Sequence, residues 1–286
     1  MDRGRRDTLQ ELMQPWKLIL AYDGTPFHGW QIQPHLPTVQ GTLAAALHRL
    51  TGEAVLPQGS GRTDTGVHAH GQIASFALAA AIPPANLLHA LNRALPPAIR
   101  ILSATHAPPQ FHARHSAIRK VYEYRIFPRV TVDGQPERIC PPMLAPYAWD
   151  CPWPFSLAAA QEAASAIFGE HDFTSFAAAD PDRATRRALL EERSEPPRSP
   201  VRTIFHSEWR LEDGLYIYRI TGSGFLHHMV RNLVGTFVDA AAGRIPANSL
   251  LQILTTRNRS AAGPTAPARG LSLVYVEYPK ECLLDA

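Results

Sequence analysis

Residues Gly59–Gln72 (GSGRTDTGVHAHGQ) form a glycine-rich stretch that leads directly into the apolar segment Ile73–Ala77 (IASFA). Glycine permits positive φ angles and lets another molecule approach the backbone closely, and a short apolar run of this kind predicts a buried strand. The stretch therefore predicts a tight loop at the start of a strand, with Asp64 on the loop and Arg62 two residues before it. Because catalytic groups concentrate on loops held by a rigid scaffold, Asp64 is the first candidate for a functional carboxylate. The alternative is an aspartate that only caps the amides of a turn.

The segments around this loop predict the first half of the fold. Thr38 is expected to cap a helix whose buried face carries Leu43, Leu47 and Leu50 at helical spacing. A second helix is expected to open at Pro83. The expected strands are 16–22, 54–56, 71–78 and 99–106. This β-α-β-β-α-β order is that of the ferredoxin-like split βαβ unit.

The second half of the chain repeats this order of elements. Alternation predicts a strand at 119–127 with Tyr122, Tyr124 and Ile126 on one face, and Asp213-Gly214 is a hairpin turn signal. Further strands are expected at 201–211, 215–221 and 271–278, and helices at 156–168, 228–242 and 247–254. The proline-rich segment 128–154 is expected to be irregular, and the charged segment 177–200 is expected to be an exposed, partly ordered insertion.

Length and composition describe a globular protein. The 286 residues suit one large domain or two of ordinary size, and 45% hydrophobic with 19% charged residues excludes a disordered chain. The three cysteines lack a CxxC spacing, which excludes a disulfide framework or a zinc knuckle and favours a reducing compartment. No apolar run approaches the length of a membrane span and no signal peptide is expected, so we expect a cytoplasmic protein without membrane contact.

Residues 61–72 (GRTDTGVHAHGQ) resemble the catalytic loop of the tRNA pseudouridine synthase A family, whose signature is close to GRTDxGVHxxGQ. Further matching segments follow in order and extend the resemblance from Tyr22 to Tyr278. They are YDGTPFHGWQ at 22–31, RKVYEY at 119–124, DFTSF at 172–176, GFLHHMVRN at 224–232 and APARGL at 266–271.

This resemblance implies an α+β fold of two ferredoxin-like (split βαβ, RRM-like) halves, whose mainly antiparallel sheets join across a central active-site cleft. On that basis we expect a flexible tail at 1–15 and an N-terminal ferredoxin-like domain at 16–112 that carries the catalytic loop. A C-terminal ferredoxin-like domain is expected at 113–286, with the insertion at about 177–200.

The resemblance also implies an isomerase that converts uridine to pseudouridine at positions 38–40 of the tRNA anticodon stem-loop and works as a homodimer. Asp64 would be the nucleophile or base acting on a flipped-out uridine. Whether it attacks C1′, attacks C6 or removes the C2′ proton stays open. Tyr122 would lie against the uracil and Arg231 would pair with Asp64. Leu271 would form an apolar wall, and Arg62 would hold a phosphate.

Two other functions fit parts of the sequence. A non-catalytic RNA-binding protein on the same fold predicts that Asp64→Ala leaves function intact. A metal hydrolase that uses Asp64, His68 and His70 predicts loss of activity with a chelator, although an HxH spacing is a weak signal. The chain has no P-loop, GxGxxG or HExxH motif, so we expect neither a cofactor nor a required metal.

Overall fold

The computed structural model describes residues 13–130, 137–178 and 199–282. The tail expected at 1–15 and the insertion expected at 177–200 lie almost entirely outside these residues. The chain forms two compact units, which we call the first unit (Met1–Val121 with Ser272–Ala286) and the second unit (Tyr122–Leu271). The domain limits drawn from the sequence, 16–112 and 113–286, stay a prediction.

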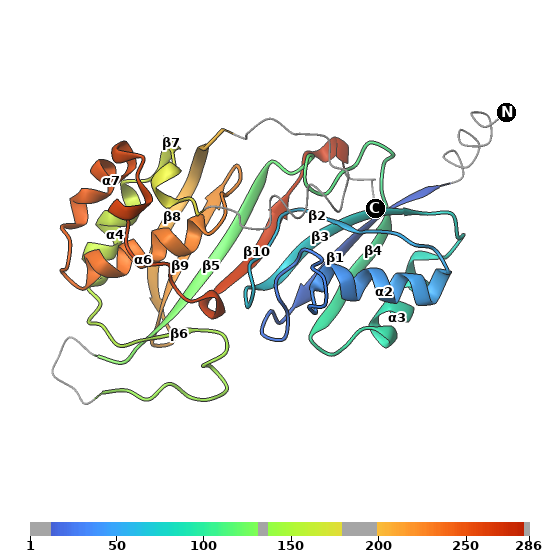
Figure 1. Ribbon diagram of the computed structural model, residues 1–286, viewed down its shortest axis with the longest axis horizontal. Coiled ribbons are helices and arrows are strands. Elements are labelled where there is room, and N and C mark those ends of the chain that lie inside the picture. Colours follow the sequence, from blue (N-terminus) through green and yellow to red (C-terminus); the bar gives the residue numbers. More distant parts are fainter. Residues whose placement is uncertain (1–12, 131–136, 179–198, 283–286) are drawn as a thin grey trace. The chain divides into compact units, whose positions relative to one another are not determined.

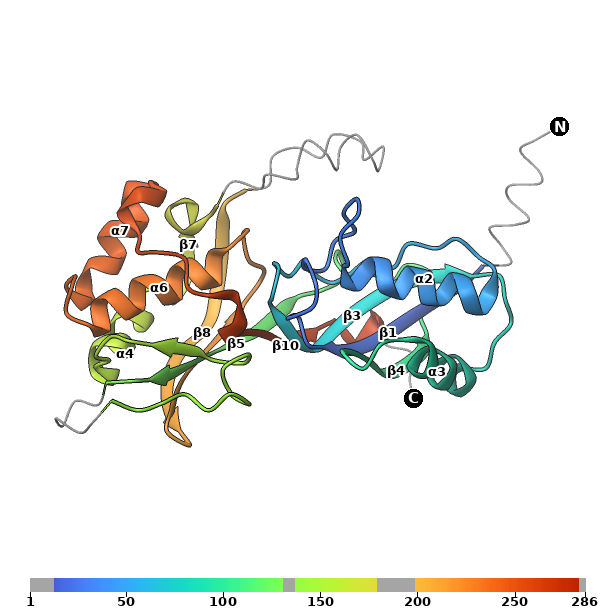
Figure 2. The ribbon, with the colours of Figure 1, turned by 60° about the horizontal axis from the view of Figure 1, so that its bottom comes forward.

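The first unit is a sheet with two helices lying side by side on one face (Figures 1 and 2). Its strands follow the order β4-β1-β3-β10, and the short β2 also pairs with β3. All these pairings are antiparallel except β3 with β10. The elements are β1 (Gln14–Tyr22), α2 (Val39–Thr51), β2 (Gln58–Gly59), β3 (His68–Leu78), α3 (Pro84–Ala94), β4 (Ile99–His106) and β10 (Leu271–Glu277).

The helix-covered face of the first unit holds its core. Alternate residues of β1, Trp16, Leu18 and Leu20, are fully buried, as the two-residue period of a strand requires. Thr38 caps α2 as expected, because its hydroxyl accepts the Gly41 amide hydrogen at 3.2 Å. Leu43 and Leu47 are buried as expected, but Leu50, in the last turn of the helix, is 38% exposed.

One predicted strand of the first unit is misplaced. Residues 54–56 form no strand, and the short β2 lies further on, with Gln58 opposite Ser75 of β3. The segment before β2 is held from the side, because the Gln40 side chain donates to the Pro57 carbonyl at 2.9 Å. A side-chain contact with α2 therefore takes the place of the backbone pairing that the apolar run suggested.

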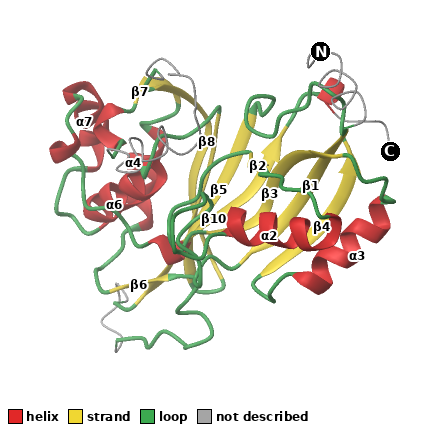
Figure 3. Ribbon diagram, turned by 45° about the vertical axis from the view of Figure 1, so that its right-hand side comes forward, coloured by secondary structure: helices red, strands yellow, loops and turns green. Residues whose placement is uncertain are grey.

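The second unit also places its helices on one face of a sheet (Figure 3). Its strands follow the order β5-β9-β8-β7, and β6 pairs with β5 in parallel. The elements are β5 (Arg119–Pro128), which begins in the first unit, β6 (Trp149–Cys151), α4 (Leu157–Ser165), β7 (Gly169–Asp172), β8 (Val201–Glu212), β9 (Leu215–Gly222), α6 (Met229–Ala241) and α7 (Leu250–Thr256).

The hairpin of the second unit forms as predicted, with Asp213 at φ 51° and Gly214 at φ 75° between β8 and β9. Two predictions are wrong in detail. Helix α4 ends at Ser165, and Gly169, at φ 96°, begins β7 instead of ending the helix. The segment expected to be irregular contains β6, which pairs with the end of β5.

The fold class is α+β with mainly antiparallel strands, as the sequence predicted. The finer description as two ferredoxin-like halves stays a prediction. None of the helices in the described part of the chain has the length and apolarity to cross a membrane.

A cluster of three charged side chains, Glu123, Arg125 and Arg210, lies on the sheet of the second unit and is called the charged ladder. Glu123 of β5, only 8% exposed, accepts hydrogen bonds from Arg125 and from Arg210 of β8, each at 3.1 Å. Burial alone would raise the pKa of Glu123, but the hydrogen bonds from Arg210 and Arg125 outweigh it, and the pKa lies below its ordinary value of 4.5.

We expect Glu123 to make the free energy of unfolding depend on pH. A carboxyl group with a lowered folded-state pKa contributes stability above its unfolded-state pKa and loses it as the pH falls through the folded-state value. The free energy of unfolding should therefore differ most between wild type and Glu123→Gln above about pH 5, and the difference should shrink below about pH 4. Urea titrations across this range measure it. A difference that does not change with pH would contradict the assignment.

Candidate active site

The loop that carries Asp64 is packed backbone to backbone against the segment 22–31. A Cβ atom on Gly29, which has φ 81°, would lie 2.5 Å from the Thr63 carbonyl oxygen, and one on Gly24 would overlap the Val67 carbonyl oxygen. The Trp30 amide donates to the Thr63 carbonyl at 3.0 Å. The two motifs, which begin 39 residues apart in the sequence (22 and 61), are therefore one structural feature, and glycine is required where their backbones meet.

Asp64 is the first residue of a tight turn. Its carbonyl accepts the Val67 amide hydrogen at 3.1 Å, and the third residue of the turn, Gly66, has φ 78°. A turn of this kind needs glycine at that position. Thr63 is buried and Asp64 is half-buried. The loop thus holds the Asp64 backbone tightly while its carboxylate stays accessible.

Two neighbours of Asp64 have distinct roles in the loop. Arg62 is exposed, and its Nε donates to the Gln31 side chain at 3.1 Å. His68 is buried, and its Nδ1 accepts the Gly24 amide hydrogen at 3.1 Å and lies 3.2 Å from Asp23 Oδ1. His68 therefore stabilises the turn at residues 23–24. His70, by contrast, is exposed on β3.

The other three predicted site residues are Tyr122 on β5, Arg231 on α6 and Leu271 at the start of β10. One segment, Pro264–Gly270, connects these elements, and we call it the strap. Arg231, in the first turn of α6, donates from Nε to the Ala266 carbonyl at 2.8 Å, and its own carbonyl accepts the Ala266 amide at 3.1 Å. Tyr124 of β5 donates to the Pro267 carbonyl at 2.7 Å. The strap therefore ties α6 to β5.

Tyr122 and Leu271 lie next to these contacts. Tyr122, near the start of β5, is 7% exposed, and its ring meets that of Phe225 edge-on with centroids 5.1 Å apart. Leu271 follows the strap as the first residue of β10 and is 5% exposed. Phe225 and the strap belong to the GFL and APARGL motifs, so the second unit brings three separate motifs together.

Sequence reasoning missed Asn232, which organises this region. Asn232 is fully buried, its Nδ2 donates to the Phe176 carbonyl at 2.7 Å, and its Oδ1 accepts from Thr265 at 2.6 Å and Arg259 at 3.0 Å. These bonds link α6 to the DFTSF turn and to the strap. The signal was a polar residue followed by Leu233 and Val234 on an apolar helix, because a buried amide must find partners.

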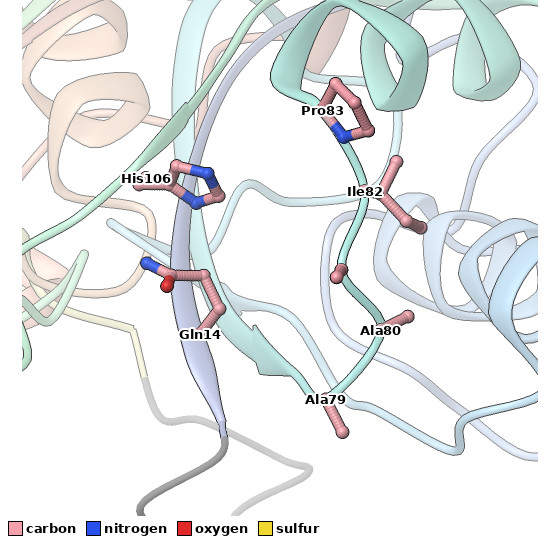
Figure 4. Close-up of a pocket in the computed structure, with 7 residues that line it drawn as sticks. Gln14, Ala79, Ala80, Ile82, Pro83 and His106 are labelled. Carbon is pink, nitrogen blue, oxygen red and sulfur yellow. The ribbon is translucent and has the colours of Figure 1, made fainter.

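A surface hollow of about 390 Å³ lies at the other end of β1 (Figure 4). Gln14, His106 and the segment Ala79–Pro83 line it. Gln14 and Tyr22 are the two ends of β1, roughly 26 Å apart along an extended strand, and Tyr22 is the end that contacts the Asp64 loop. Among the described residues, no acidic side chain lines the hollow, so we assign it no part in the chemistry of Asp64.

Comparison with known proteins identifies the class. A family model described as tRNA pseudouridine synthase matches residues 18–116 and 163–279. The chain is 45% identical over 266 residues to tRNA pseudouridine synthase A of Solibacter usitatus, covering 93% of this chain and all of that protein. It is 43% identical over 271 residues to tRNA pseudouridine synthase A of Moorella thermoacetica, covering 92% and 98%. The matches define an enzyme of the isomerase class. The chain belongs to the tRNA pseudouridine synthase family.

Proposed function

We propose that this enzyme converts uridine to pseudouridine at positions 38–40 in the anticodon stem-loop of tRNA, with Asp64 as its reacting group. The observation that carries the proposal is the Asp64 turn, in which a half-buried carboxylate stands on a loop fixed by close backbone contacts. The full GRTDTGVHAHGQ match to the family's catalytic loop supports it.

The reaction needs no added group. The N1–C1′ bond of the uridine breaks, the uracil turns, and C5 bonds to C1′. C5 loses its hydrogen as a proton and N1 gains one, so substrate and product have the same atoms. Asp64 serves as nucleophile or base in this sequence, and the nucleotide first leaves the base stack at a cost of a few kcal/mol.

Three residues of the second unit complete the proposed chemistry. Tyr122 offers a ring against which a flipped uracil lies, Arg231 pairs with Asp64 and keeps its carboxyl charged, and Leu271 shields the carboxylate from water. Their support is the strap, which fixes Arg231 through two hydrogen bonds and places Leu271 directly after it. The roles themselves come from the motif match.

Release of the C5 hydrogen gives a direct test. Transfer RNA carrying tritium at C5 of its uridines should lose label to water when the enzyme acts on it. Label release in the presence of a chelator supports the isomerase and removes the hydrolase built on Asp64, His68 and His70. Strong tRNA binding without label release would instead indicate an RNA-binding protein.

We propose that Arg62 contacts a phosphate of the tRNA, because it is exposed two residues before Asp64. Arg62→Gln should weaken tRNA binding and lower the slope of log Kd against log salt by about 0.7–1. Binding measured between 50 and 300 mM salt checks this. Arg49→Gln is the control, since Arg49 is also an exposed arginine of the first unit but lies in the last turn of α2, outside the Asp64 loop. Equal slopes for wild type and Arg62→Gln would refute the contact.

We also propose that the enzyme is a homodimer, on the family resemblance. Light scattering should return twice the chain mass of 31.5 kDa over the working concentration range. A monomer mass that persists with tRNA bound would contradict it.

A further inference from the structure

One buried side chain joins both ends of the Asp64 loop. Gln72, on β3, is fully buried. Its Nε2 donates to the Gly61 carbonyl at 2.9 Å, and its Oε1 accepts from the Ser60 hydroxyl at 2.5 Å and from the Ile73 amide at 3.2 Å. The residue that closes the loop thus holds the two residues that open it.

A second contact reaches the residue next to Asp64. The Tyr22 hydroxyl lies 2.8 Å from the Thr63 hydroxyl and 3.4 Å from Gln72 Nε2. Burial raises the pKa of Tyr22 to about 12, although its hydrogen bonds with Thr63 and Gln72 lower it. Tyr22 is therefore a neutral hydroxyl at working pH and can donate a proton to a hydrogen bond. We call Tyr22, Ser60, Thr63 and Gln72 the loop clamp.

Two further hydrogen bonds hold Ser60, a member of the loop clamp. The Lys120 ammonium donates to the Ser60 carbonyl at 2.6 Å, and the Ser60 amide donates to the Ile73 carbonyl at 2.8 Å. Residues 60, 61 and 63 all lie within four positions of Asp64. Each is hydrogen-bonded by a side chain from outside this stretch, namely Lys120, Gln72 and Tyr22 in that order. Between Ser60 and Asp64, the side chains of Ser60 and Thr63 are buried, whereas Arg62 is exposed and Asp64 is half-buried.

We propose that Gln72 is a positioning residue for the isomerisation, acting through the loop clamp to aim the Asp64 carboxylate. The inference rests on the proposed catalytic role of Asp64. A carboxamide suits the task because it supplies donors and an acceptor from one uncharged group. Gln72 touches the loop backbone and not the reacting atoms, so it should govern kcat and leave tRNA affinity alone.

Gln72→Met keeps the size of the side chain and removes its hydrogen bonds. We expect kcat to fall by roughly 10- to 100-fold, since a misplacement of about 1 Å costs about that much, while KM for tRNA changes less than about threefold. Thr63→Val should lower kcat in the same way, and Thr63→Ser, which keeps the hydroxyl, should restore it. Tyr22→Phe combined with Thr63→Val should be no worse than Tyr22→Phe alone, because Tyr22→Phe already removes the hydrogen bond between Tyr22 and Thr63.

Gln40→Met is the matched control. Gln40 is also a buried glutamine of the first unit, and it bonds Pro57 and Ile32 at 2.9 Å each. It should lower Tm to a similar extent and leave kcat near the wild-type value when both are assayed well below Tm.

Several outcomes would overturn the inference. These are an unchanged kcat in Gln72→Met, a change confined to KM, or equal loss of kcat in Gln40→Met. If Gln72→Met does not fold, the Thr63→Val and Thr63→Ser pair decides alone. Asp64→Asn assayed alongside separates the two proposals. An active Asp64→Asn enzyme refutes the proposed function, whereas an inactive one with an unimpaired Gln72→Met refutes only the role of Gln72.

Discussion

Asp64→Asn should lower kcat for pseudouridine formation by at least about 10²-fold, since loss of a general base costs about 10² to 10⁴ and loss of a nucleophile about 10⁶. The amide has almost the size of the carboxylate, and the turn is held by backbone contacts of Thr63, Asp64 and Val67, so the loop should keep its shape. Binding of tRNA should stay within about threefold of wild type, because the phosphate contacts that dominate affinity remain.

Asp213→Asn is the control for this substitution. Asp213 is exposed at the hairpin turn with φ 51°, a conformation that asparagine adopts as readily. Its kcat should equal that of wild type. If Asp64→Asn keeps more than a tenth of the wild-type kcat, the carboxylate is not the reacting group and the proposed mechanism is wrong.

Gly235→Ala should destabilise the protein by about 3 kcal/mol or more, although alanine is the better helix former. Helix propensity alone would favour alanine by about 1 kcal/mol. The added Cβ, however, would overlap the Pro264 carbonyl oxygen and lie 2.8 Å from its carbon. Both are backbone atoms of the strap, so neither rotates away, and a packed interior gives little room. Arg231 lies one turn earlier on α6 and bonds the same strap.

Thermal unfolding measures this effect, and Tm should fall by roughly 6 °C or more. Gly224→Ala is the control, because its nearest neighbours, in the Arg202 side chain, lie at 3.6 Å or beyond. That substitution should change Tm by less than about 2 °C. A Gly235→Ala protein as stable as wild type would contradict the close packing of α6 against the strap.

The sequence predicted the elements that depend on local rules. Thr38 as a helix cap, Asp213-Gly214 as a hairpin turn and a strand at 119–127 were all correct, since each depends on residues close in sequence. The misplaced strand at 54–56 arose where a distant contact decides, because the Gln40 side chain donates to the carbonyl of Pro57 just after it. The parallel pairing of β10 with β3 joins residues some 200 positions apart, and no local pattern predicted it.

In the candidate site, too, the features set by local sequence were predicted and those set by distant contacts were not. Asp64 and its glycines were visible as a motif, and the Asp64 turn is where it was expected. Gln72 and Asn232 also stood in quoted motifs, yet their importance comes from the partners they bind. Those partners, such as Tyr22 for Gln72 and Arg259 for Asn232, lie far away in sequence, and no local pattern identifies them.

The most direct measurement maps new pseudouridine in tRNA. Transfer RNA with uridines at positions 38–40 is incubated with the enzyme and a chelator, and pseudouridine is located by chemical labelling and primer extension, with Asp64→Asn alongside. We predict new pseudouridine within positions 38–40 for wild type and none for Asp64→Asn. Pseudouridine only outside the anticodon stem-loop, or equal amounts from both proteins, would contradict the proposed function.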